Sequence, residues 1–113
     1  MSVYVVNIVI PSGADFEQTF TLESSESNSY IDLRNYTGAS FLKKSAESSS
    51  ISAIFNVSFP NPQQGEVKIS LGSSITSSLK SGRYVYDILL NNGLKKIRVV
   101  EGSALVTAGV TTS

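Results

Sequence analysis

Apolar and polar residues alternate along much of this chain, in short segments that are separated by turns. In the segment DFEQTFTLE, residues 15–23, Phe16, Phe20 and Leu22 share one set of alternate positions, while glutamate and threonine take the other. A strand with one buried face has this pattern, because successive side chains point to opposite faces of a sheet. The expected strands are 3–10, 15–23, 40–44, 51–59, 66–71, 83–90 and 94–100, with a last segment around 103–107.

Short strands at this spacing are typical of a β-sandwich, and we expect one all-β domain of about seven strands. The domain is expected to span residues 1–113, with 108–113 as a flexible or docking tail. One segment, around 73–80, has a helical pattern. A serine at its start can cap it, and Ile75 and Leu79 lie four residues apart on one face. Its length permits one short helix of one or two turns.

The inward positions of these strands define a predicted core. They carry aromatic and branched residues, whose burial is the main favourable term in folding. The predicted core residues are Phe16, Phe20, Leu22, Phe55, Val57, Val67, Ile69, Tyr86, Ile88, Ile97 and Val99.

Near the C-terminus the sequence predicts a β-hairpin around Asn92-Gly93. This pair favours a two-residue type I′ turn, because both central residues of that turn need a positive φ. A turn here pairs Ile88 with Ile97 on the core face and Asp87 with Arg98 on the other face. Asp87 is then most simply an outward residue in a cross-strand ion pair, worth about 0.2–1 kcal/mol.

The outer face of this hairpin is more apolar than a solvated sheet requires, and we expect it to contact another protein subunit. The predicted interaction face consists of Val85, Asp87, Leu89, Lys96, Arg98 and Val100. Glu101, the nearest carboxylate in sequence, is expected opposite Tyr84 on the other face. Asp87 therefore lacks the second carboxylate that acid–base catalysis would want.

Composition removes several kinds of chemistry. The chain of 113 residues contains no cysteine and no histidine. Disulfides, thiolate nucleophiles, the usual transition-metal ligands and the commonest general base are therefore absent. The serines form no G-x-S-x-G motif, and no phosphate-binding loop is present. We accordingly predict no catalytic, cofactor-binding or metal-binding residues and expect a protein that is not an enzyme.

Charge also narrows the range of partners. Nine basic residues balance nine acidic ones, so the chain lacks the basic footprint of a nucleic-acid-binding protein. Lysines and arginines do gather around the hairpin, but the neighbouring tyrosines are expected to face the core. No signal-peptide pattern is visible, and the apolar run 3–10 is far shorter than the ~20 residues that span a bilayer. We expect no membrane partner and no nucleic acid.

Five stretches occur in a defined order along the chain. They are GADFEQTFTL at 13–22, IDLRNYTGA at 31–39, PNPQQGEVKISL at 60–71, SSLKSGRYVYDILL at 77–90 and RVVEGSALVTAGVT at 98–111. Taken in this order, they resemble small virion proteins of tailed bacteriophages that carry an immunoglobulin-like sandwich, similar to the N-terminal module of phage baseplate upper proteins. One departure is Arg34-Asn35, where the family pattern has threonine and glycine.

The resemblance implies an immunoglobulin-like β-sandwich and a non-enzymatic structural role in the virion, which assembles in the host cytoplasm. It implies other virion proteins as partners, from the tail or baseplate region in the first place, and it leaves a homo-oligomer open. A capsid-surface decoration protein is the alternative, a carbohydrate-binding adhesion module comes third and a small enzyme fourth. The family pattern carries no catalytic residues, so none is transferred to this chain.

Overall fold

The computed structural model describes residues 3–23 and 32–110, and the end of the expected tail, 111–113, lies outside this part. The strands are β1 (Tyr4–Val5), β2 (Ile8–Pro11), β3 (Phe16–Thr21), β4 (Thr37–Lys43), β5 (Ala53–Ser58), β6 (Glu66–Leu71), β7 (Gly82–Asn91) and β8 (Lys96–Thr107). The helices are the 3₁₀ turn η1 (Pro62–Gln64) and α1 (Ser73–Ser78). The predicted all-β fold with a short α-helix is confirmed, and in the described residues no helix is longer than α1.

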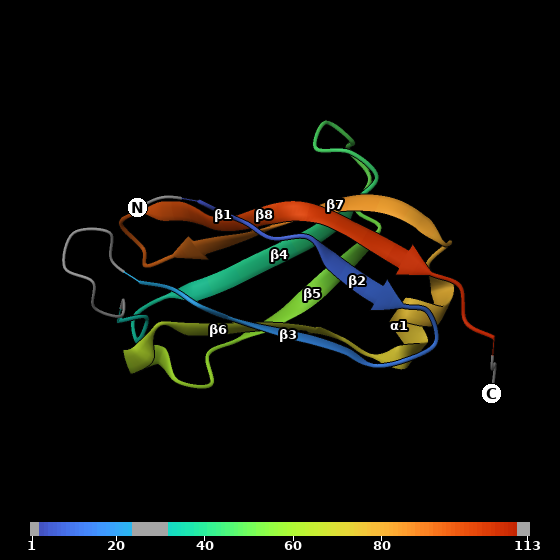
Figure 1. Ribbon diagram of the computed structural model, residues 1–113. Coiled ribbons are helices and arrows are strands. Elements are labelled where there is room, and N and C mark those ends of the chain that lie inside the picture. Colours follow the sequence, from blue (N-terminus) through green and yellow to red (C-terminus); the bar gives the residue numbers. More distant parts are fainter. Residues whose placement is uncertain (1–2, 24–31, 111–113) are drawn as a thin grey trace.

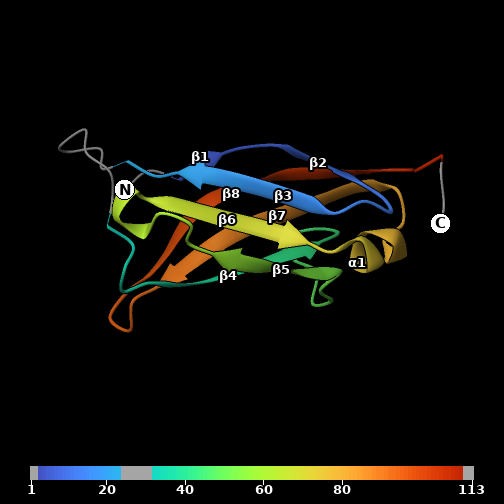
Figure 2. The same ribbon diagram turned by 90° about the horizontal axis from the view of Figure 1, so that it is seen from below.

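The strands form one curled sheet whose two halves face each other. Its order is β1-β8-β7-β4-β5-β6-β3, and β2 also pairs with β8. In Figure 1, β8, β7 and β4 form the upper layer and β6 and β3 the lower one, and Figure 2 shows β6 and β3 lying across β7 and β8. β5 connects the layers, because its first half pairs with β4 and its second half with β6. All pairs are antiparallel except those of β1 and β2 with β8.

β1 and β2 are two parts of one interrupted strand. Both pair with β8 in the same register, from Tyr4 opposite Val100 to Ile8 opposite Ala104. The sequence predicted a continuous strand over 3–10, and this is wrong at residues 6 and 7. There the Tyr86 hydroxyl donates a hydrogen bond to the Val6 carbonyl at 2.6 Å.

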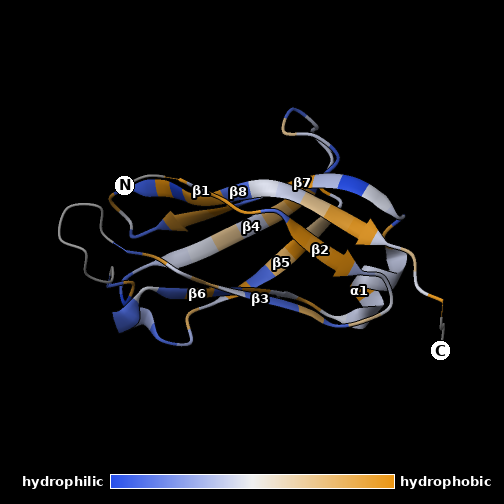
Figure 3. Ribbon diagram, viewed as in Figure 1, coloured by the Kyte–Doolittle hydropathy of each residue, from blue (hydrophilic) through white to orange (hydrophobic). Residues whose placement is uncertain are grey.

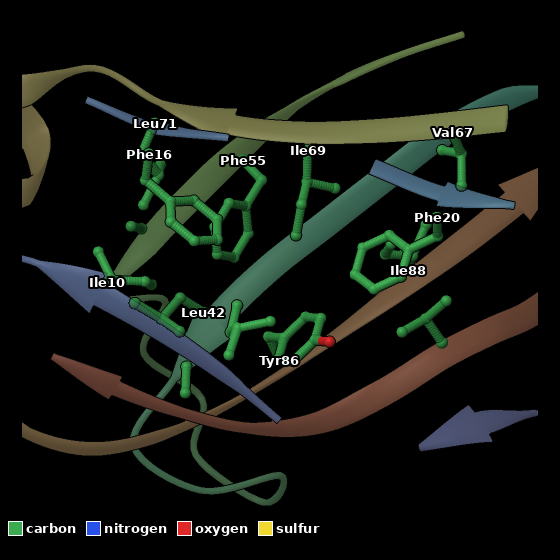
Figure 4. Packing of buried hydrophobic residues seen from close by; sticks show 14 of the residues in the cluster. Ile10, Phe16, Phe20, Leu42, Phe55, Val67, Ile69, Leu71, Tyr86 and Ile88 are labelled. Atoms are coloured by element: carbon green, nitrogen blue, oxygen red, sulfur yellow. The ribbon is translucent and has the colours of Figure 1, made fainter. Parts of the chain in front are cut away.

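The core lies between the two layers. Figure 4 shows Ile10, Phe16, Phe55 and Tyr86 pointing toward one another from different strands. The Phe55 ring lies 6.1 Å from that of Phe16 and 6.2 Å from that of Tyr86, in the tilted geometries that aromatic pairs prefer. The predicted core is confirmed except at two positions: Val57 and Ile97 are only partly buried and pack against its edge.

Helix α1 packs through Thr76, and the predicted apolar face is half wrong. Leu79 is buried as expected, but Ile75 is 42 % exposed. Thr76 is fully buried, and its hydroxyl donates to the Ala14 carbonyl at 2.8 Å. No serine caps the helix, since the N-cap residue is Gly72, and the Asp15 carboxylate accepts a hydrogen bond from the Ser73 N–H at 2.8 Å. The turn between β2 and β3 therefore supplies both contacts.

The β7–β8 hairpin closes through a longer loop than predicted. β7 ends at Asn91 and β8 begins at Lys96, which leaves residues 92–95 as the loop. The Asn92 side-chain oxygen accepts the N–H groups of residues 94 and 95 at 2.9 and 2.8 Å and so stabilises this wider turn. Gly93 has the positive φ that the sequence predicted, +91°. The predicted two-residue turn and its strand register are wrong.

A bulge in β8 changes which residues face outward. Leu89 pairs with Arg98 and Ile88 with Val100, so Val99 is an extra residue in the ladder. Val99 and Val100 are both fully buried. The prediction that Val100 belongs to the interaction face is therefore wrong. β8 continues without a break to Thr107, and the separate segment expected at 103–107 is its second half.

Candidate functional site

The outer face is the surface of β1, β8, β7, β4 and β5 that points away from the core. One row of residues crosses all five strands of this face, and we call it the central row. Its members, in the order in which they pair, are Val5, Glu101, Asp87, Phe41 and Ile54. Val5 is 73 % exposed, Phe41 36 % and Ile54 60 %, so apolar side chains lie open on both sides of the two carboxylates.

A hollow of about 550 Å³ lies on this face, above β4, β7 and β8. Its lining includes Val85, Leu89 and Phe41, and Ala46 adds a side wall. Ala46 belongs to the loop between β4 and β5, which rises from the upper layer in Figure 1. The volume of the hollow is within the usual range of binding clefts in proteins, and its lining combines apolar with charged side chains.

The predicted ion pair between Asp87 and Arg98 is present. The Arg98 Nε donates to Asp87 Oδ2 at 2.9 Å, and both side chains are partly exposed. The pair is diagonal, because Arg98 lies opposite Leu89, two residues from Asp87. An exposed pair of this kind contributes little to stability, so its main effect is to orient the two charges in the hollow.

Glu101 lies directly opposite Asp87 on the outer face. The sequence placed it opposite Tyr84 and left Asp87 without a second carboxylate nearby, and both expectations are wrong because of the bulge in β8. Among the described residues Glu101 forms no ion pair. Lys43 also lines the hollow without forming one there. The hollow thus contains two acidic and two basic groups around an apolar floor.

The predicted interaction face is largely brought together. Val85, Asp87, Leu89 and Arg98 all line the hollow. Lys96 is exposed on the same face, opposite Asn91. Whether these residues contact a partner stays a prediction.

Four residues of the central row were missed from the sequence: Val5, Phe41, Ile54 and also Glu101, which the sequence placed on the other face. The signal for Ile54 was present, because it is an apolar residue at an outward position of the alternating segment 51–59. The outward position of Phe41 could not be predicted, because apolar and polar residues alternate only partly in its segment, 40–44. Val5 lies in a run that is apolar at almost every position, so its face could not be assigned.

Tyr86 supports the site from below. Its ring is buried in the core, while its hydroxyl bonds the Val6 carbonyl, and burial raises the pKa of Tyr86 to about 12. Beside it, the Asn7 side-chain oxygen accepts the N–H of Ser103 at 3.1 Å and replaces a ladder bond. These contacts hold the β1–β2 strand against β8 and so place Val5 beside Glu101.

The described residues offer binding groups and no metal site. No group of three or more histidine, cysteine, aspartate or glutamate side chains in residues 3–23 and 32–110 could hold a metal ion. Over the same part of the chain, no helix has the length and apolar character needed to cross a membrane.

No model of a known protein family matches the chain, and no curated protein matches it in sequence. Among solved structures, the N-terminal domain of phage TP901-1 ORF48 is similar in fold, with a TM-score of 0.53 and 10 % identity. The match covers 94 % of this chain and 98 % of that domain. The similarity shows that a domain of a phage protein has the same fold.

Two other structures match only part of larger proteins. InlP of Listeria monocytogenes matches with a TM-score of 0.45 and 15 % identity, over 90 % of this chain and 26 % of that one. A family 123 glycoside hydrolase from Clostridium perfringens matches with a TM-score of 0.43 and 15 % identity, over 97 % of this chain and 24 % of that one. This chain thus corresponds to about a quarter of each of the two matched chains.

Proposed function

We propose that this chain is a non-enzymatic structural protein of a bacteriophage particle, an assembly module that acts through protein–protein contacts. The observation that carries the proposal is the outer face, where exposed apolar side chains surround a hollow with four charged groups. Large exposed apolar side chains that gather on one face, rather than lying scattered singly, are a mark of protein interaction sites. The ordered motifs that resemble small virion proteins support the particle as the setting, and so does the phage domain that shares the fold over nearly its whole length.

Within the particle, the tail or baseplate is our first choice. The motif order resembles the N-terminal module of baseplate upper proteins, and this resemblance is the reason for the choice. A capsid-surface decoration protein is the alternative location. Both locations need the same kind of contact face.

A carbohydrate-binding adhesion module is a second candidate function, and one observation favours it. Phe41 is partly exposed in a hollow that also contains Asp87, Arg98 and Glu101. An aromatic ring beside charged groups can bind a saccharide. Against this, the apolar surface extends well beyond the hollow to Val5 and Ile54, which fits the larger area of a protein contact better.

The test is the protein content of particles purified from a host that expresses this chain with its neighbouring genes. We expect quantitative mass spectrometry to find the chain in a fixed ratio to the other virion proteins, in the tail fraction after heads and tails are separated. A fixed ratio in the head fraction would support the decoration role instead. Absence of the chain from the particles would overturn the proposal, and retention of the free chain on a glycan array would then favour adhesion.

A further inference from the structure

The central row contains an electrostatic imbalance that the bulge in β8 produces. Asp87 and Glu101 lie directly opposite each other on neighbouring strands, where like charges destabilise a sheet. Arg98 is the one ion-pair partner that the described residues supply to them, and it binds Asp87. Without the bulge, Glu101 would lie on the other face of β8. In the isolated domain, the Glu101 carboxylate therefore has no ion-pair partner among the described residues.

The surroundings of Glu101 suit a long basic side chain. Phe41 and Leu89 form an apolar surface in the same hollow, and Val5 lies beside Glu101 on β1. Lysine and arginine lay their aliphatic stems on such surfaces and keep the charged head at a polar group. Arginine also stacks on aromatic rings and donates two hydrogen bonds to one carboxylate.

We propose that the hollow receives one arginine or lysine side chain from a segment of another virion protein. The head of that side chain pairs with Glu101, and its stem and an apolar neighbour cover Phe41 and Leu89. The inference rests on the proposed function and specifies the chemistry of the partner.

A second copy of this chain is a poorer occupant. The strands of the outer face carry more basic than acidic side chains: Lys43, Arg83, Lys96 and Arg98 against Asp87 and Glu101. Two copies placed face to face would bring this excess of positive charge together. The segment that binds is therefore expected to have one basic residue among apolar or acidic ones, so that its flanks complement Lys43 and Lys96.

The stability of the isolated domain gives a first test. Glu101→Gln removes the like-charge contact with Asp87, so we expect this variant to melt at the same or a higher temperature than the wild type. Glu17→Gln is the matched control, because Glu17 is also an exposed strand glutamate but pairs with Lys68 on the other layer. We expect the melting temperature of the Glu17→Gln control not to rise above that of the wild type. A clear loss of melting temperature in Glu101→Gln alone would show that Glu101 serves the domain itself and would overturn the proposal.

Incorporation into particles gives the second test. We expect Glu101→Lys to lower the content of the chain in purified particles by about tenfold, because a like-charge contact replaces an ion pair at the interface. Glu17→Lys makes the same change of charge on the other layer and is expected to leave the content unchanged. Equal incorporation of both variants would overturn the inference while leaving the proposed function standing. Absence of the wild-type chain from particles would instead overturn the proposed function.

A photo-crosslinking amino acid at position 41 identifies the occupant in assembled particles, with position 54 as the substitute if the first variant does not assemble. We expect an adduct with a segment of a different virion protein that has an arginine or lysine within a few residues of the cross-link. Mutating that residue to glutamate should restore incorporation of Glu101→Lys. An adduct with a second copy, with a saccharide or with a segment lacking a basic residue would contradict the proposal, and so would a failure of the charge swap to rescue.

Discussion

Asp87 and Glu101 show how two residues with the same charge acquire different roles on one face. Asp87 is held by Arg98 at 2.9 Å, and its strand lies in the middle of the upper layer between β8 and β4. Glu101 lies opposite Asp87 without an ion pair among the described residues. The first carboxylate therefore orients the charges within the domain, and the second remains available for a contact outside it.

The Asp87 pair provides a prediction at the residue scale. We expect Asp87→Lys to leave the isolated domain folded, because an exposed ion pair contributes only about 0–1 kcal/mol and the new lysine lies opposite Glu101. Incorporation into particles should nevertheless fall, because an unpaired charge at an interface is costly. Thermal unfolding and the protein content of particles measure the two effects. The double variant Asp87→Arg with Arg98→Asp restores an ion pair within the domain but exchanges the positions of the two charges. It need not restore assembly if the partner binds either side chain. Normal incorporation of Asp87→Lys would show that this face is merely solvated.

Tyr86 provides a prediction about pH. Its pKa is raised by burial to about 12, above the ordinary value of 10.0. Between these two values the unfolded chain loses the phenolic proton while the folded chain keeps it, so the folded state binds more protons. Stability should therefore be fully present below pH 10 and fall as the pH rises through this window. Chemical unfolding at several alkaline pH values tests this. In Tyr86→Phe this part of the pH dependence should vanish, and stability at neutral pH should fall by about 1 kcal/mol because the bond to Val6 is lost.

At the scale of elements, the contact between β8 and the β1–β2 strand shapes the edge of the outer face. The break at residues 6 and 7 and the bond from Tyr86 lie beside Gly102 and Ser103 of β8, three to four residues after the bulge at Val99. Gly102 lies at the centre of this contact, because a Cβ atom there would collide with the Val6 carbonyl oxygen. β2 and the end of β8 also present Val9 and Leu105 outward, and both segments are strongly apolar in Figure 3. This edge extends the apolar surface of the outer face.

Gly102→Ala tests that contact. We expect the added methyl group to push the β1–β2 strand away from β8 and to lower the free energy of unfolding by about 1–3 kcal/mol. Hydrogen exchange should become faster at residues 4–10. Gly72→Ala is the matched control, since nothing lies within 4 Å of a Cβ atom at that position, and we expect it to change stability by less than about 1 kcal/mol. Equal effects of the two substitutions would show that the close contact at Gly102 is unimportant.

At the scale of the whole molecule, the two layers share one core. Phe20 and Val67 come from the lower layer and Ile88 from the upper one, and all three are buried in the same cluster. α1 and the turn before β3 close one end through Thr76. The shared core joins the outer face to the rest of the sandwich, which suits the proposed assembly role.

Phe20→Ala tests the shared core. Phe20 is only 8 % exposed, so we expect a loss of about 3–5 kcal/mol in the free energy of unfolding, which is a large share of a small domain's stability. Urea unfolding measures the loss, and Thr19→Ala, an exposed position on the same strand, is the control. A loss below about 1 kcal/mol for Phe20→Ala would mean that the core relaxes around the cavity far more than is usual.

The sequence by itself determined where most of the strands lie, most of the core and the outward position of Asp87. Each of these follows from alternation along a single strand, because the period of two assigns faces without reference to any neighbour. It also placed Asp87 and Arg98 on one face, and the ion pair formed even though the register differs. Alternation alone therefore identified four residues that line the hollow: Val85, Asp87, Leu89 and Arg98.

Only the tertiary structure decided the bulge, and with it the positions of Val100 and Glu101. A bulge adds one residue and reverses the alternation after it, and its place depends on contacts with strands that are distant in sequence. The Asn92 side chain accepts two backbone N–H groups within the longer loop, and beyond the bulge the Tyr86 hydroxyl donates to the Val6 carbonyl. The central row depends on this register across five strands. Alternation within one strand could not predict it, because register is a property of pairs.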